Sequence, residues 1–327
     1  MTAPLTSDPS AQTATPEAIA QGPGKAIQGR SLGQIAWMRL KRDRVAMFSL
    51  GVVIFFVLIA VLAPLLAKLE GNSPYKFYSN TLDFDRGSKP KGAFGGISAN
   101  HWLGVEPTTG RDLFARLVYG ARTSLTVALL STLISVVLGT ILGVMAGYFR
   151  GWVDTAISRF MDLLLAFPQL LLLIALTPVI TQYVSRLVYL ISVIGFFGWP
   201  YFGRIIRGQT LSLREREFVD AARAIGASNG HILFKQLLPN LVAPILVYST
   251  LIIPTYVSLE AALSYLGVGI GEPTPSWGRW LSDSVSYSYD DPMYLVIPGT
   301  ALFLLVLAFN LFGDGLRDAL DPKAGRS

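Results

Sequence analysis

The polar stretch RIIRGQTLSLREREFVDAARAIGASNGHILFKQ, residues 204–236, separates two long apolar runs of this chain. It contains the pattern DAAxxxG, formed by Asp220-Ala221-Ala222 and Gly226, and the residues Leu237-Leu238-Pro239-Asn240 follow it directly. Runs of about 20 apolar residues can cross a bilayer, whereas a segment this rich in charge cannot. The stretch is therefore predicted to be a connector that lies outside the membrane between two spans.

Within the connector, the residue pattern predicts a short amphipathic helix. Acidic residues near its start complement the helix dipole, and its alanines favour a helix of little bulk. Gly226 is expected to stop this helix or to let another chain approach closely. Taken alone, the same pattern also fits an ordinary connector. The acidic residues are Glu215, Glu217 and Asp220, and the predicted small apolar face holds Phe218, Ala221, Ala222 and Ile225.

The overall composition is that of a membrane protein. Hydrophobic residues make up 52% of the 327 residues, charged residues make up only 15%, and the mean hydropathy is +0.49. A soluble domain carries about 25% charged residues. The net charge of +6 therefore fits a protein face on anionic lipid rather than a nucleic-acid surface. The absence of cysteine excludes disulfides and thiolate metal sites.

Six membrane spans are predicted from the apolar runs. Several of them contain proline, which is tolerated where a helix packs against neighbours or lines a cavity. The predicted spans are residues 47–67, 124–148, 156–180 with Pro168, 187–202 with Pro200, 241–266 with Pro244 and Pro254, and 294–312.

The basic residues predict which ends face the cytoplasm. Arg39, Lys41, Arg42 and Arg44 precede the first span, and several arginines lie in the connector, whereas the short loops after the third and fifth spans are poor in basic residues. The positive-inside rule then places both termini and the connector in the cytoplasm.

The chain divides into segments of different character. Residues 1–30 are poor in large apolar residues and are predicted to be a disordered cytoplasmic tail. Residues 31–46 predict an amphipathic helix in the membrane interface, although a basic flank that only orients the first span is the alternative. The other predicted segments are 47–123 with the first span and a long extracytoplasmic loop, 124–313 with the remaining spans and the connector loop 204–240, and the cytoplasmic tail 314–327.

Signatures of nucleotide binding and of hydrolysis are missing from the sequence. No GxxxxGK[ST] motif is present, so the chain is not expected to bind ATP in the Walker manner. Neither His101 nor His231 begins an HExxH motif, and no GxSxG elbow occurs. Gly139, Gly143 and Gly147 instead form a ridge of small residues that lets another helix approach closely.

The connector resembles the EAA loop of the membrane subunits of bacterial ATP-binding cassette (ABC) importers. Its flanks are similar to the dipeptide and oligopeptide permease branch, in particular to the second membrane subunit of each pair. Asp220 stands where glutamate is usual, which keeps the charge, and Gln236 replaces an apolar residue. The resemblance spans roughly residues 31–323, with further blocks HWLG at 101–104, GRD at 110–112, YGAR at 119–122, GWVD at 151–154, LAFP at 165–168, EAALSYLG at 260–267 and PTPSWG at 273–278.

This resemblance implies an all-α membrane protein with six transmembrane helices, the type I ABC importer permease fold and an N-terminal elbow helix. It also implies a permease subunit without enzymatic activity, which forms half of the translocation path for di- or oligopeptides in a bacterial inner membrane. The implied partners are a homologous permease, two ATPase subunits that carry ATP and Mg, an extracytoplasmic solute-binding protein and membrane lipid, but no nucleic acid. No cofactor or metal is expected on this chain.

In that family the connector forms a cytoplasmic coupling helix that sits in a groove of the ATPase. The residues of this chain that match the motif, or lie beside it, are then expected to contact the ATPase. They are Glu217, Phe218, Asp220, Ala221, Ala222, Gly226 and Ala227.

Polar groups of the fifth span are the candidates for the translocation path. Glu260 is notable because a charge inside a span costs on the order of 3 kcal/mol. Such a carboxylate faces a cavity or a partner, or else it forms a salt bridge or lies at a solvated helix end. After the sixth span, Asp314, Arg317 and Asp318 are predicted to cap the helix and to pair with one another. The candidates for the path are Thr250, Thr255, Tyr256, Ser258 and Glu260.

Three alternatives stay open at this point. The same architecture imports nickel chelates or other small solutes in close relatives of the resembled branch. A secondary transporter driven by an ion gradient would show inverted repeats and buried titratable relays, which the sequence does not display. A membrane-embedded hydrolase would need a nucleophile constellation, which is missing as well.

Overall fold

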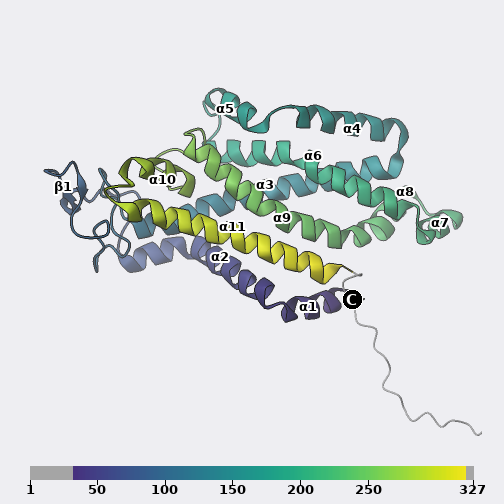
Figure 1. Cartoon of the computed structure of the whole chain (residues 1–327). Coiled ribbons are helices and arrows are strands. Elements are labelled where there is room, and N and C mark those ends of the chain that lie inside the picture. The colour runs from purple at the N-terminus through teal and green to yellow at the C-terminus, as the bar shows by residue number, and fades with distance from the viewer. Residues whose placement is uncertain (1–31, 322–327) are drawn as a thin grey trace, which may run out of the picture.

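The computed structural model describes residues 32–321, which form a bundle of long helices running side by side (Figure 1). The hairpin β1–β2 and helix α10 lie at one end of the bundle, called here the α10 end, and helix α7 lies at the other, the α7 end (Figure 1). The predicted tail of residues 1–30 falls outside the described residues. The elements are α1 (Leu32–Arg42), α2 (Arg44–Glu70), β1 (Leu82–Asp83), β2 (Lys89–Pro90), α3 (Leu113–Phe149), α4 (Gly151–Ala166), α5 (Gln169–Ile180), α6 (Arg186–Arg214), α7 (Glu217–Ala224), α8 (Asn229–His231), a π-helical turn (Ile232–Leu237), α9 (Leu238–Tyr265), α10 (Trp277–Ser284) and α11 (Pro292–Leu320), with single 3₁₀ turns at Ser79–Thr81 and Val285–Tyr287.

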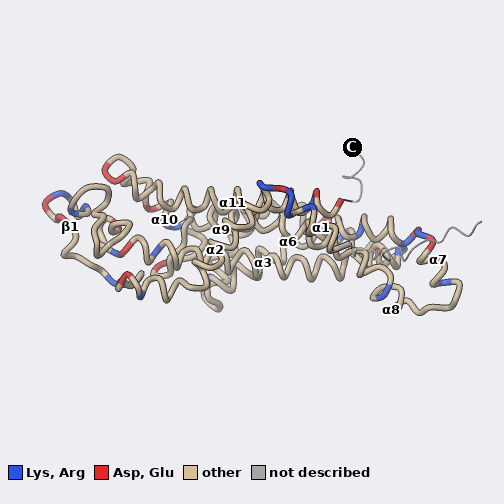
Figure 2. Tube along the Cα trace, turned by 90° about the horizontal axis from the view of Figure 1, so that it is seen from below, with Lys and Arg blue, Asp and Glu red and all other residues tan. Residues whose placement is uncertain are grey.

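Within residues 32–321, five helical runs are long and apolar enough to cross a membrane, and a bent pair of helices adds a sixth candidate. The five are α2, α3, α6, the run Asn229–Tyr265 that ends in α9, and α11, whereas α4 and α5 form the bent pair. Lysine, arginine, aspartate and glutamate gather toward the two ends of the bundle, and a long uncharged stretch separates them (Figure 2). The predicted count of six spans is therefore confirmed if the bent pair counts as one.

The third predicted span is not a continuous helix. α4 and α5 meet at an angle of 80°, so the span predicted over residues 156–180 is broken at its proline. Pro168 has no N–H to donate and disfavours the helical conformation of the residue before it. Phe167 accordingly adopts extended backbone, with a ψ angle of 132°. The sequence had shown the proline, but the size of the bend depends on the helices packed around it.

The glycine ridge of α3 is packed directly against α6. A Cβ atom on Gly139 would lie 2.9 Å from the Gly203 nitrogen, and one on Gly143 would lie 2.6 Å from the Gly203 oxygen. A Cβ atom on Gly147 would lie 2.9 Å from the Arg207 oxygen. The predicted close approach of another helix is thus confirmed, and that helix is α6.

Helix α1 joins the bundle through a tight corner. The Asp43 carboxylate caps α2 by accepting hydrogen bonds from the N–H groups of Val45 at 2.9 Å and Ala46 at 3.0 Å. Leu40 packs with Ala46 and with Ala319 of α11 in one small apolar cluster. Residues 32–42 therefore form the helix that the sequence predicted before the first span, and this helix contacts the last one.

The last span is longer than the sequence predicted. Residues 314–327 were expected to form a tail, but α11 continues without a break to Leu320. Gly313 and Gly315 are buried, the first beside Leu251 of α9 and the second beside Ala46 of α2. This packing holds the last turns of α11 against two neighbouring helices.

We expect Gly143→Leu to destabilise the bundle, because its side chain has no room between α3 and α6. Overpacking of this kind costs about 1–3 kcal/mol, and a backbone contact leaves little scope for relaxation. The measurement is the thermal unfolding midpoint of the purified protein in detergent. The matched control is Gly51→Leu on α2, because nothing lies within 4 Å of a Cβ atom at that position. Equal midpoints for the two variants would contradict the predicted packing constraint.

Candidate functional site

Helix α7 is docked on the end of the bundle through a small apolar cluster. Val219 and Ala222 of α7 are buried there against Tyr148 of α3 and against Ile232 and Leu237. The opposite side of α7 is open, and the Ile225 side chain that follows the helix is 85% exposed. The helix thus presents one face to its own bundle and another face outward.

The side of α7 that docks on the bundle is not the small apolar face predicted from the sequence. Of that predicted face, Phe218, Ala221 and Ile225 are exposed, and only Ala222 is buried, together with Val219. Of the predicted coupling residues, Ala222 is buried and Ala227 is half-buried. The exposed ones are Glu217, Phe218, Asp220, Ala221 and Gly226.

Gly226 ends this helical segment in a left-handed conformation. Its φ angle is +81°, its N–H donates to the Arg223 oxygen at 2.9 Å, and the Ala227 N–H donates to the Ala222 oxygen at 3.0 Å. Such a turn satisfies carbonyls at a helix end and favours glycine. Of the two roles that the sequence left open for Gly226, the helix stop is confirmed.

Arginines of α6 connect the neighbouring helices next to α7. Arg207 of α6 donates two hydrogen bonds to Asp154 of α4, at 2.5 and 2.8 Å, and Arg204 pairs with Asp162. Arg214 donates to the Tyr148 backbone oxygen, and its guanidinium lies 5.9 Å from the centre of the Tyr148 ring. These contacts tie α3, α4 and α6 together next to α7. Sequence reasoning missed Tyr148, whose only signal was an aromatic residue at the end of a span.

A cavity of about 570 Å³ lies between α4, α5, α6, α9 and α11. Two of the candidate path residues line it, Thr255 and Tyr256, and the Tyr256 hydroxyl shares a hydrogen bond of 2.7 Å with Ser135. The α4–α5 bend contributes residues from both sides of the break. The lining residues are Leu165, Gln169, Phe197, Gly198, Tyr201, Phe202, Ile205, Tyr248, Leu251, Ile252, Thr255, Tyr256 and Arg317.

The other path candidates lie elsewhere on α9. Thr250 donates its hydroxyl to the Val247 oxygen at 2.8 Å, and Ser258 donates to the Pro254 oxygen at 2.9 Å, so both bond to their own helix. Gln169 and Arg317, in contrast, line the cavity and were missed by the sequence reasoning. A polar residue directly after the LAFP block was the available signal for Gln169.

Glu260 is fully buried and is enclosed by serine hydroxyls. Ser124 of α3 donates to it at 2.7 Å, Ser264 of α9 donates at 2.7 Å, and Ser276 donates at 3.0 Å. Ser276 also caps α10 by accepting a hydrogen bond from the Arg279 N–H. Within residues 32–321 the carboxyl group therefore has no salt-bridge partner and no contact with solvent. It thus forms neither the salt bridge nor the solvated helix end that the sequence had left open. It joins α3, α9 and the start of α10.

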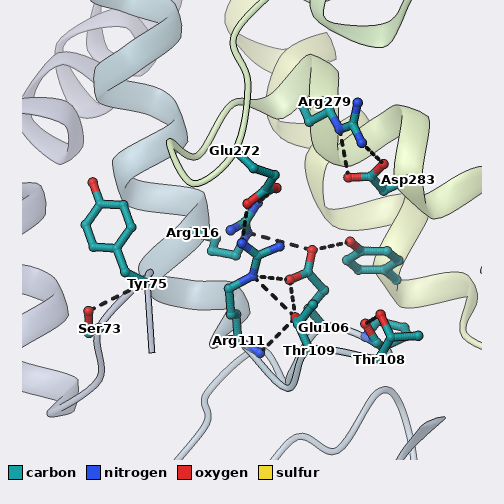
Figure 3. Close-up of polar contacts among 12 residues, drawn as sticks. Ser73, Tyr75, Glu106, Thr108, Thr109, Arg111, Arg116, Glu272, Arg279 and Asp283 are labelled. Atoms are coloured by element: carbon teal, nitrogen blue, oxygen red, sulfur yellow. Dashed lines mark hydrogen bonds and ion pairs between the residues drawn. The ribbon is translucent and has the colours of Figure 1, made fainter. Parts of the chain in front are cut away.

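A cluster of opposite charges joins the loops at the α10 end. Figure 3 shows Arg111 between Glu106 and Glu272, beside Arg116 of α3. The Arg111 Nε atom donates to Glu106 at 2.6 Å, and its Nη1 atom pairs with Glu272. Tyr294 of α11 donates its hydroxyl to Glu106 at 2.7 Å. The cluster thus connects the loop before α3, the loop before α10 and the start of α11.

The charges of this cluster shift the pKa values of its members in opposite directions. Burial alone would raise the pKa of Glu272, but the hydrogen bond from Arg111 and the charges of Arg116 and Arg111 outweigh it and hold this pKa below its ordinary value. Burial acts to lower the pKa of the Arg111 guanidinium, but its hydrogen bonds to Glu272 and Glu106 raise it above the ordinary value. Both groups are therefore charged at neutral pH.

Over the described part of the chain, no group of three or more histidine, cysteine, aspartate or glutamate side chains could hold a metal ion. His101 is paired with a single carboxylate, Asp112, at 2.7 Å.

We expect Glu106→Gln to destabilise the α10 end strongly, because it leaves the buried guanidinium groups of Arg111 and Arg116 without a full counter-charge. Removing one partner of a buried ion pair costs about 3–5 kcal/mol. The control is Asp290→Asn, which breaks the exposed Lys89–Asp290 pair and is expected to cost less than about 1 kcal/mol. Thermal unfolding in detergent compares them, and a smaller loss for Glu106→Gln than for Asp290→Asn would refute the argument.

Comparisons with known proteins agree with this architecture. A family model described as "Binding-protein-dependent transport system inner membrane component" matches residues 139–326. A second model, the "N-terminal TM domain of oligopeptide transport permease C", matches residues 31–90.

Curated relatives match the chain over most of its length. The dipeptide transport system permease protein DppC of Alkalihalophilus pseudofirmus is 40% identical over 309 residues, which cover 94% of this chain and 96% of that protein. The glutathione transport system permease protein GsiD of Escherichia coli is 39% identical over 287 residues, which cover 88% of this chain and 89% of that protein.

A solved structure supports the fold. A chain of the MetNI methionine ABC transporter in inward-facing conformations superposes with a TM-score of 0.51 at 21% identity, covering 63% of this chain and 96% of the other. The helical bundle of this chain therefore has the type I ABC importer permease fold. The chain therefore belongs to the family of binding-protein-dependent transport permeases, the multi-pass membrane subunits of ABC importers, in which separate subunits hydrolyse ATP.

Proposed function

We propose that this permease subunit imports di- or oligopeptides that an extracytoplasmic solute-binding protein delivers to it. The observation that carries the proposal is the 40% identity to a dipeptide permease over 94% of the chain. The subunit would pair with a homologous permease and with two ATPase subunits that bind ATP and Mg. Family membership removes the ion-driven transporter and the membrane hydrolase from consideration.

The proposed location is the inner membrane of a bacterium, with both termini and α7 in the cytoplasm. Basic residues support this orientation, because they flank α2 at its start and surround α7, as the positive-inside rule requires. The α10 end, with its long loop between α2 and α3, would then face the solute-binding protein.

In the proposed mechanism, α7 is the coupling helix. Its exposed residues Phe218, Asp220 and Ala221 would sit in a groove of the ATPase, while Val219 and Ala222 hold it to Tyr148 of α3. ATP-driven closure of the ATPases would therefore move α3 and α6 with α7. Coupling of this kind requires ATP and substrate to favour different states of the importer.

The cavity lined by Thr255 and Tyr256 is proposed as this subunit's half of the translocation path. Pairing with the second permease would supply the opposite wall. Glu260 would act beside the path rather than in it, because its hydrogen bonds with Ser124 and Ser276 hold α10 in place. Thr250 and Ser258 would stabilise α9 through their bonds to its backbone.

Glutathione is a second candidate substrate, because a glutathione permease is 39% identical to this chain. Nickel chelates and other small solutes are the alternative substrates that the following test distinguishes. The cognate solute-binding protein, purified without added ligand and analysed by mass spectrometry, would carry the substrate. A bound peptide supports the proposal, whereas a bound metal chelate contradicts it.

We expect single cysteines to report the proposed sidedness. The natural chain contains no cysteine, and Ile225 and Phe94 are 85% and 68% exposed at opposite ends. In spheroplasts expressing the permease pair without the ATPases, an impermeant maleimide should label Phe94→Cys but not Ile225→Cys. Permeabilisation should make Ile225→Cys reactive. The opposite labelling pattern would exclude α7 as a cytoplasmic coupling helix.

We also expect Gly226→Leu to impair coupling. No described residue lies within 4 Å of a Cβ atom at Gly226, so a side chain there would project toward a docked ATPase. The left-handed backbone adds strain for any residue with a Cβ atom. Binding of the ATPases should weaken by about tenfold or more, corresponding to ~1.4 kcal/mol, and uptake should fall with it.

Two control variants separate the causes. Gly226→Asn keeps the left-handed conformation at lower strain with a smaller side chain, so it should retain more coupling than leucine. Asp220→Glu should be nearly silent, because it conserves the charge at the helix start. Co-purification of the ATPases and substrate-stimulated ATP hydrolysis are the measurements. If Gly226→Leu gave wild-type values in both measurements, α7 would be a connector without a coupling role.

A further inference from the structure

The cavity between α5, α6, α9 and α11 has an unusual balance of charge. Of the described residues that line it, Arg317 alone carries a charge, and no carboxylate is among them. The remaining polar groups are an amide, hydroxyls and tyrosine rings, and the rest of the wall is apolar. The cavity therefore offers one full positive charge within a surface that is otherwise neutral.

Arg317 has no side-chain partner among the described residues. The sequence predicted that it would pair with Asp314 or Asp318, but within residues 32–321 its side chain forms no ion pair or hydrogen bond. It lies in the last turns of α11, and its side chain lines the cavity. A guanidinium presents a planar fork of donors that matches a carboxylate.

Gln169 supplies a second unused donor. It is the first residue of α5, directly after the break at Pro168, and it lines the same cavity. Its Nε2 atom is buried and has no hydrogen-bond partner among the described residues. A buried donor left without an acceptor is unfavourable, so this amide favours a ligand that brings an acceptor oxygen.

We propose that this cavity recognises the carboxylate of its transported solute, with Arg317 as the charged contact and the Gln169 amide as the second donor. The proposal rests on the proposed function, because it takes the cavity as part of the translocation path. It narrows the substrate class to zwitterionic or anionic solutes with a free carboxylate, such as unmodified peptides. A peptide whose carboxyl end is amidated keeps an acceptor oxygen for the Gln169 amide but loses the charge that pairs with Arg317.

The test compares a dipeptide, dialanine, with its carboxyl-terminal amide. The complete importer, with both permeases, the ATPases and the binding protein, is reconstituted in proteoliposomes. The maximal ATP-driven uptake rate of each compound is measured at saturating binding protein. Because the binding protein is the same in every sample, its own preference cancels when variants are compared.

Arg317→Gln should lower the uptake rate of dialanine by about tenfold, the typical weight of one charged hydrogen bond, and should affect the amide far less. Arg317→Lys, which keeps the charge, should recover part of the loss. Asp318→Asn is the matched control one position away and should behave as the natural chain. Equal losses for dialanine and its amide would give Arg317 a merely structural role and overturn the proposal.

A second measurement applies if Arg317→Gln fails to assemble, or if the binding protein does not bind the amidated dipeptide. Saturation-transfer NMR on the permease–ATPase complex without binding protein detects weak contact with each compound directly. The natural complex and Asp318→Asn should contact dialanine more than the amide, and Gln169→Leu should weaken the contact with dialanine. No preference for dialanine in the natural complex, or undiminished contact in Gln169→Leu, would overturn the proposal. Absence of any ATP-driven peptide uptake by the natural complex would instead contradict the proposed function.

Discussion

Close packing of α3 against α6 is the constraint on which the rest of this bundle depends. α3 has 37 residues and, at 1.5 Å per residue, is about 56 Å long. It carries Tyr148 at the α7 end, and it carries Arg116 and Ser124 toward the α10 end. Because Gly139, Gly143 and Gly147 bring it into backbone contact with α6, the two helices form one closely packed pair that connects both ends.

Charge is handled differently at the ends of the bundle and within it. At the α10 end, Arg111 is neutralised by Glu106 and Glu272, and these pairs connect the loop before α3 to the loop before α10. Inside the bundle, the partners of Glu260 among the described residues are the hydroxyl groups of three serines. Hydroxyls satisfy a buried carboxyl group without bringing a second charge into the apolar region, where each charge is costly to bury.

The bend at Pro168 forms one part of the cavity wall. The 80° break places Leu165 and Gln169, one from each side of it, on a wall that α6 and α9 also line. α11, which continues beyond its predicted end, adds Arg317 to the same wall. Two departures from the simplest six-helix arrangement thus bring together the polar groups that the cavity offers to a solute.

The sequence by itself determined the membrane class, the approximate spans and the family, because apolar length, charge placement and motif order are local properties of a chain. It also predicted the helix at the DAAxxxG stretch and its stop at Gly226, since a left-handed turn favours glycine. The tertiary structure alone decided which face of α7 is buried, because that depends on the position of Tyr148. It also decided that Glu260 lies among serines rather than in a cavity, and that Arg317 lines one. Those environments are made by residues far apart in the chain, such as Ser124 and Ser276, and no spacing within a single helix contains that information.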